Sequence, residues 1–231
     1  MPSSPISPSS LRSDLYATPD DEPCPPLVIP VLASLLDRAV ARNERPGKSP
    51  EADGTPPPAA PPPPPSRIHA FDSRRVPDMS IRSFLERVFR YTGAAPSVYV
   101  VAYVYVDRVC RIRPGLRVTQ ANAHRLLLSA IVVASKFLED INYRNSRFAE
   151  VGGLPTGELN RLELELLFLM GFKLHVSLSV FESYCRHLER EVSLGGGYQI
   201  ERALRLVCGG EITGKKKGRA EQPNQSAAHV L

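Results

Sequence analysis

Residues 121–140 read ANAHRLLLSAIVVASKFLED. When this stretch is wound as a helix, Leu, Ile, Val and Ala occupy nearly every side of it. At about 1.5 Å per residue the helix is about 30 Å long, which is the diameter of a small domain. A helix that is apolar nearly all round has to be covered by other helices. The stretch therefore predicts a central, buried helix.

The segments on both sides of it carry helix start and stop signals. Ser80 precedes an apolar run of helical spacing that ends at Gly93, and Pro96 opens a second run that stops before Pro114. No segment alternates apolar and polar residues with the period of a strand, so the sequence predicts an all-α domain. The helices expected are residues 81–92, 96–111, 121–140, 145–151, 156–170 and 178–192.

Proline placement divides the chain of 231 residues. Of its 23 prolines, 18 lie in residues 1–66, so this first quarter cannot be a packed helical domain. One amphipathic helix within it is too short to be stable alone, and we expect it to pack against the domain. The expected division is a disordered Ser/Pro-rich arm at 1–26, the N-terminal helix at 27–43, a Pro-rich linker at 44–66, the domain at 67–193 and a C-terminal segment at 194–231. Within the C-terminal segment we expect a weak helix at 199–207, followed by a disordered basic tail that includes Lys215–Arg219.

Composition and motifs exclude several classes of function. The formal net charge of +5 is small for a dedicated nucleic-acid-binding domain. The four cysteines have no metal-ligand spacing, and no motif for a catalytic nucleophile, a phosphate loop or a metalloprotease is present. Neither a long uncharged apolar run nor a secretory signal is recognisable. We expect a non-enzymatic protein with no metal, cofactor, small-molecule substrate or membrane partner.

Two charged residues stand among aliphatic neighbours. On the central helix Lys136 shares a stripe with Arg125, Val132 and Val133, a mixture typical of a surface that contacts a partner. On the helix at 156–170, Glu163 lies in an apolar arc and needs a cation or hydrogen-bond donors, because stranding a buried carboxylate is costly. Lys136 is an available cation. Such a pair suits recognition of a polypeptide, although spacing alone favours a structural role.

A second charged pair is expected between the first two helices of the domain. Asp107 follows a run of valines and tyrosines and shares its face with apolar side chains, so it needs a partner. Arg82 on the preceding helix is the candidate. This pair predicts architecture, because it would hold the two helices in register.

Four spaced motifs resemble the cyclin box. They are Ile81–Leu85 (IRSFL), Tyr105–Arg108 (YVDR), Leu128–Glu139 (LSAIVVASKFLE) and Arg161–Phe172 (RLELELLFLMGF). Two further segments, Asn122–Arg125 (NAHR) and Ala149–Gly153 (AEVGG), are similar to plant P-type cyclins, also called U-type, which resemble the yeast phosphate-signalling cyclins. The resemblance covers about residues 77–192. It implies a single five-helix cyclin box with an extra N-terminal helix.

The resemblance also implies a partner, a cyclin-dependent protein kinase bound as a heterodimer. Lys136 and Glu163 match the two charged residues with which the family grips the kinase, and Arg82 and Asp107 match its buried pair. Val88 replaces the Trp of the family's substrate-docking patch, so docking of Arg-x-Leu substrates is in doubt. The kinase-binding residues expected are Lys136, Glu163, Val132, Val133 and Arg125.

The predicted function is therefore that of a regulatory cyclin that activates a kinase in cell-cycle or nutrient-linked growth control, in the nucleus, the cytoplasm or both. The alternative is an adaptor of cyclin fold that binds a transcription factor or nucleic acid, since one fold serves several functions. That alternative predicts a basic stripe. The sequence offers only the tail lysines and a dispersed arginine set, Arg108, Arg111, Arg113 and Arg117, so nucleic acid is not expected as a partner.

Overall fold

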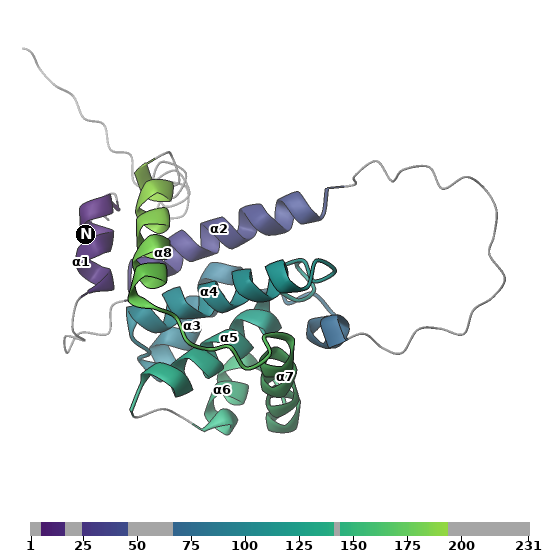
Figure 1. Ribbon diagram of the computed structural model, residues 1–231. Coiled ribbons are helices and arrows are strands. Elements are labelled where there is room, and N and C mark those ends of the chain that lie inside the picture. The colour runs from purple at the N-terminus through teal and green to yellow at the C-terminus, as the bar shows by residue number, and fades with distance from the viewer. Residues whose placement is uncertain (1–5, 17–24, 46–66, 141–143, 194–231) are drawn as a thin grey trace, which may run out of the picture.

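The computed structural model describes residues 6–16, 25–45, 67–140 and 144–193, and within these ranges every regular element is helical. The prediction of an all-α fold is confirmed. Figure 1 shows the arrangement. The elements are α1 (Pro8–Leu15), α2 (Val28–Asn43), the short 3₁₀ helix η1 (Arg67–Phe71), α3 (Ile81–Thr92), α4 (Pro96–Ile112), α5 (Ala123–Leu138), α6 (Asn145–Gly152), α7 (Thr156–Leu169) and α8 (Leu178–Glu191).

Local sequence signals set the ends of several helices. The Ser80 hydroxyl accepts a hydrogen bond from the backbone N–H of Ser83 and so caps α3, which ends at Gly93 in the left-handed conformation (φ 60°). Pro96 occupies the first turn of α4, where its missing N–H costs nothing. The predicted bounds of α3 and α8 agree with the structure within one residue.

Helix α5 is the core of the domain. Eleven of its 16 residues are buried, in keeping with the apolar sequence quoted above. It packs on α4 along one side and on α7 along another, and α6 contacts it as well. The expectation of a central helix is confirmed. The exposed residues of α5 are in its last turn, from Lys136 onward, while His124 and Arg125 in its first turn are partly buried.

Helix α2 packs back onto the domain, as expected, against α3 and α4. Its inner face is apolar and buried along most of its length. No side chain of its own caps its first turn, because Leu27 stands at that position. Asp14 supplies the cap instead, since its carboxylate accepts a hydrogen bond from the backbone N–H of Leu27 at 2.8 Å.

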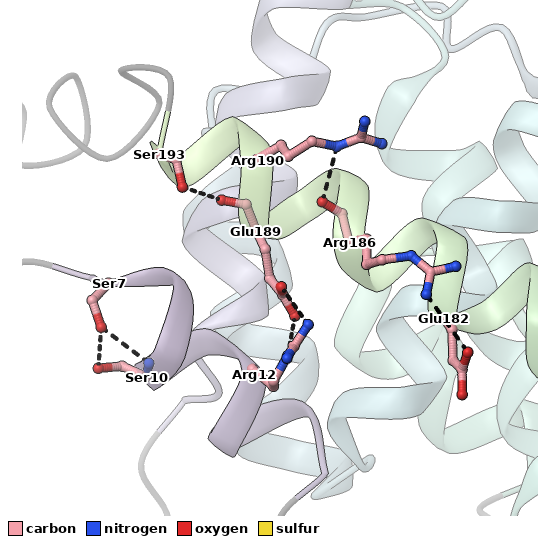
Figure 2. Close-up of polar contacts among 8 residues, drawn as sticks. All are labelled: Ser7, Ser10, Arg12, Glu182, Arg186, Glu189, Arg190 and Ser193. Carbon is pink, nitrogen blue, oxygen red and sulfur yellow. Dashed lines mark hydrogen bonds and ion pairs between the residues drawn. The ribbon is translucent and has the colours of Figure 1, made fainter.

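Helix α1 corrects the prediction that residues 1–26 are disordered, which is wrong for Pro8–Leu15. The Ser7 hydroxyl caps the helix, and Leu11 and Leu15 are buried against α8, α2 and α4. Figure 2 shows the arm at this contact, with Arg12 reaching Glu189 on α8. The prediction of disorder rests on the abundance of Ser, Pro and Asp and gives no weight to two leucines at helical spacing, Leu11 and Leu15. The weak helix at 199–207 and the basic tail lie outside the described residues.

Candidate functional site

Lys136 and Glu163 meet at the surface. Lys136 lies in the last turn of α5 and Glu163 in the middle of α7, and the Lys136 Nζ atom is 2.6 Å from Glu163 Oε1. The Lys136 side chain is 36% exposed and that of Glu163 15%. The ammonium therefore faces solvent, while the carboxylate lies mostly below the surface.

Asn145, the first residue of α6, is a member of this site that the sequence did not indicate. Its Nδ2 group donates to Glu163 Oε2 at 2.5 Å and to Asn160 Oδ1 at 2.8 Å. Its own Oδ1 atom is buried and has no hydrogen-bond partner in the described part of the chain. Three helices thus converge on the Glu163 carboxylate and hold it in one position.

Large exposed apolar side chains follow both members of the ion pair along the chain. Phe137 and Leu138 follow Lys136 on α5, and Leu164 follows Glu163 on α7, and each is about half exposed. Phe168 and Phe172 continue the row, with their rings edge to face at 5.3 Å. We call this surface the α5–α7 face; its residues are Lys136, Phe137, Leu138, Asn145, Glu163, Leu164, Phe168 and Phe172.

One sequence signal for this face was present. Leu162, Leu166 and Leu169 are buried on the inner side of α7. Leu164 and Phe168 are four residues apart on its other side, where a surface helix normally carries polar residues, and Phe172 follows in the turn after the helix. A helix that is apolar on two sides at once has a second surface to cover, which is typical of a partner interface.

Val132 and Val133 do not belong to this surface. Both are buried, with at most 3% of either residue exposed, so the prediction that they contact a kinase is wrong for the folded chain. The physical reason is that α5 is enclosed by its neighbours up to Ser135. Residues that share one side of such a helix form a surface only where no other helix covers them, which on α5 begins at Lys136.

Arg125 is committed to contacts within the chain. Its guanidinium donates to the backbone carbonyl of Asp72 at 2.7 Å and forms an ion pair with Glu158 on α7. Its side chain is only 14% exposed. Burial, together with the nearby Arg161 charge, lowers the pKa of Arg125. This arrangement ties the segment after η1 to α5 and α7, and the predicted kinase contact at Arg125 has no support in the structure.

The predicted pair of Arg82 and Asp107 is wrong. Arg82 pairs with Glu86 on its own helix at 2.7 Å, one turn away. Asp107 points toward α8, where it accepts a hydrogen bond from the Tyr184 hydroxyl, and it pairs with Arg111 at 2.9 Å. Burial and the bond to Asp107 raise the pKa of Tyr184. Asp107 therefore fixes α8 on α4, and its partner was not predictable because it lies 77 positions away.

Two more residues of the YVDR motif hold the loop between α7 and α8. The Tyr105 hydroxyl donates to the carbonyl of Leu174 at 3.0 Å, and the Arg108 guanidinium donates to the carbonyls of Lys173 and His175. The motif thus fixes the loop between α7 and α8 against α4.

Metal-ligand clusters, membrane-spanning helices and reactive cysteines are other features of the described residues that could indicate a function. They contain no group of three or more potential metal ligands, and none of their helices is both long and apolar enough to cross a bilayer. Burial raises the pKa values of the Cys110 and Cys185 thiols to about 11, which keeps both protonated at neutral pH.

Comparison with known proteins identifies the family. A model of the cyclin family matches residues 27–174. Cyclin-U2-1 of Arabidopsis thaliana is 58% identical over 213 residues, which cover 91% of this chain and 90% of that protein. Cyclin-P2-1 of Oryza sativa subsp. japonica is 54% identical over 224 residues, 94% of this chain and 99% of its own. Cyclin-U1-1 of Arabidopsis thaliana is 40% identical over 173 residues, 75% and 77% of the two chains. The chain belongs to the cyclin family, and within it the chain is similar to the plant cyclins of the P and U types.

Proposed function

We propose that the α5–α7 face binds a cyclin-dependent protein kinase and activates it. The observation that carries the proposal is the ion pair of Lys136 with Glu163, together with five large apolar side chains, each about half exposed, on the same two helices and in the turn after α7. Exposed apolar patches of this kind are characteristic of protein interfaces. Family membership supports a regulatory role for the chain, and the finer assignment to kinase binding rests on this face.

The polar groups of the face suit a polypeptide backbone. The Lys136 ammonium has three N–H donors, of which Glu163 takes one, so the others are available to carbonyl groups. The Glu163 carboxylate, which also accepts a hydrogen bond from Asn145, is held in place and can accept from a backbone N–H of a partner.

Activation follows from differential binding. A kinase is active when its catalytic Lys–Glu pair and its metal-binding Asp are both in place. A face that binds only that arrangement shifts the equilibrium toward it, and a shift from 1:99 to 99:1 requires about 5.5 kcal/mol of differential affinity. The cyclin contributes no catalytic group in this scheme. We propose cell-cycle or nutrient-linked growth control as the process served.

No structural observation favours the alternative of a nucleic-acid or transcription-factor adaptor. Arg111 pairs with Asp107, which leaves Arg108 as a single uncompensated cation that does not form a basic stripe with it. The basic tail at Lys215–Arg219 lies outside the described residues.

The proposal is tested by titrating candidate cyclin-dependent kinases with the wild-type protein and with Leu164→Asp. Leu164 is exposed, so the substitution leaves the fold unchanged by circular dichroism but places a charge in the face. We expect kinase affinity to fall at least about tenfold. Val76→Asp is the matched control, because Val76 is about half exposed, as Leu164 is, but lies outside the face, and it should bind as the wild type does. Wild-type affinity of Leu164→Asp would refute the proposed interface.

A further inference from the structure

A second concave surface lies between α4 and α8 and shares no residue with the α5–α7 face. It is a groove of about 470 Å³. Val104 forms part of its buried floor, while Ile112 at the end of α4 and Val180 in the first turn of α8 are 44% and 38% exposed. Helices α7 and α8 lie well apart in Figure 1. The two surfaces come nearest at the loop after α7, where Arg108 at the groove edge donates to the carbonyl of Lys173, the residue after Phe172.

The charge around the groove is positive. Arg108, Arg111 and Asp107 stand at its edge, and Asp107 is already paired with Arg111. The Arg108 guanidinium is held by two carbonyl groups, which orient it without neutralising it, and it has no carboxylate partner among the described residues. The edge of the groove therefore carries one fixed, uncompensated cation.

The start of α8 adds to this potential. Ser177 caps the helix, Ser179 and Val180 line the groove, and no acidic residue lies in the first turn. The N-terminus of a helix carries partial positive charge, which an acidic side chain normally offsets. Here that charge, like that of Arg108, is left for another molecule.

We propose that the α4–α8 groove binds an acidic segment of a partner protein in which aspartate or glutamate flanks an aliphatic or aromatic side chain. The apolar side chain packs on Val104, Ile112 and Val180, and the carboxylate lies between Arg108 and the start of α8. A second copy of this chain is a poor occupant, because its net charge is +5. Nucleic acid is also disfavoured, since the floor of the groove is apolar.

The test is a fluorescence-polarisation titration of the full chain with labelled synthetic peptides. One panel has Leu or Phe flanked by Asp or Glu, and matched panels replace the acids by Asn or Gln, or by Lys. We expect acidic members to bind, at least about tenfold more tightly than their neutral matches, with an affinity that falls as salt is raised. Failure of every acidic member to exceed its neutral match overturns the proposal.

Val180→Glu locates the binding. The substitution places glutamate three residues after Ser177, the spacing of a capping box, so α8 remains stable while a carboxylate enters the groove. We expect this variant to lose the acidic peptides and to retain the kinase, whereas Val76→Glu retains both. Peptide binding that survives Val180→Glu, competition by an oligonucleotide, or dimerisation that Val180→Glu abolishes would each overturn the assignment. Kinase binding is read separately, so failure here leaves the α5–α7 proposal untouched.

Discussion

Arg12 on α1 and Glu189 on α8 form a two-bond ion pair across 177 positions of sequence. Arg12 Nε lies 2.9 Å from Glu189 Oε1, and Arg12 Nη2 lies 3.0 Å from Oε2. Figure 2 shows the two side chains pointing toward each other. Asp14, near the end of α1, also caps α2, so α1 connects α8 with α2. Residues 8–15 are therefore part of the folded domain, although the motif resemblance covers only about residues 77–192.

Leu11→Ala should detach α1. Leu11 is fully buried, and truncating a buried leucine costs about 2–5 kcal/mol where the structure cannot relax. An eight-residue helix has little stability of its own, so we expect local undocking with the remaining domain intact. Hydrogen exchange measured by mass spectrometry should show lost protection at residues 8–15. Arg12→Gln, which removes only the ion pair, should cause a much smaller loss; unchanged protection in Leu11→Ala would contradict the docking.

Asp107→Ala should destabilise the domain more than Arg82→Gln. The first substitution leaves the Tyr184 hydroxyl and Arg111 without their shared partner, at a cost of about 1–3 kcal/mol. The second removes an ion pair between neighbouring turns of α3, worth about 0.5 kcal/mol or less. Urea denaturation of the two variants measures both values. Equal losses would indicate that Arg82 and Asp107 belong to one pair after all.

His124 should make stability depend on pH. Its Nε2 atom lies 2.8 Å from the Met79 carbonyl, and its ring packs edge to face on Phe84. Burial lowers the pKa of His124 below its ordinary value of 6.5, although the charge of Asp37 opposes the shift. The unfolded chain then binds the proton more readily than the folded one. The free energy of unfolding is thus highest above about pH 6.5 and falls as the pH drops toward the folded pKa, by up to about 1.4 kcal/mol per unit.

The test compares the free energy of unfolding of the wild type and of His124→Gln, measured by urea denaturation at about pH 7.5 and about pH 5.5. The variant keeps a donor for the Met79 carbonyl but does not titrate, so its decline should be smaller. The same decline in both proteins would assign the pH dependence to other groups.

The sequence was sufficient for most of the architecture because the signals involved are local. Ser80, Gly93 and Pro96 fix helix ends within one turn of themselves, and the apolar run of α5 requires burial whatever covers it. For the same reason Lys136 and Glu163 could be recognised as a pair. Each was anomalous among its own neighbours, and the structure brings the two together.

The failures all concern long-range neighbours. Asp107 needed a partner, but the choice between Arg82 and Tyr184 depends on how α8 packs, which no local pattern specifies. Val132 and Val133 have the composition of a surface stripe, yet helices distant in sequence cover them. Helix α1 was missed because two leucines are a weak signal until α8 supplies a surface on which to bury them.

The most direct test of the central claim exchanges the charges of the ion pair. Lys136→Glu and Glu163→Lys each place two like charges at a position where the wild type has an ion pair, whereas the double variant restores an ion pair with its polarity reversed. The measurement is kinase activity as a function of added cyclin, with thermal unfolding as the control for fold. If the face grips a kinase, the double variant unfolds at the wild-type temperature but fails to activate the kinase. Full activation by the double variant would show that the pair serves only the fold.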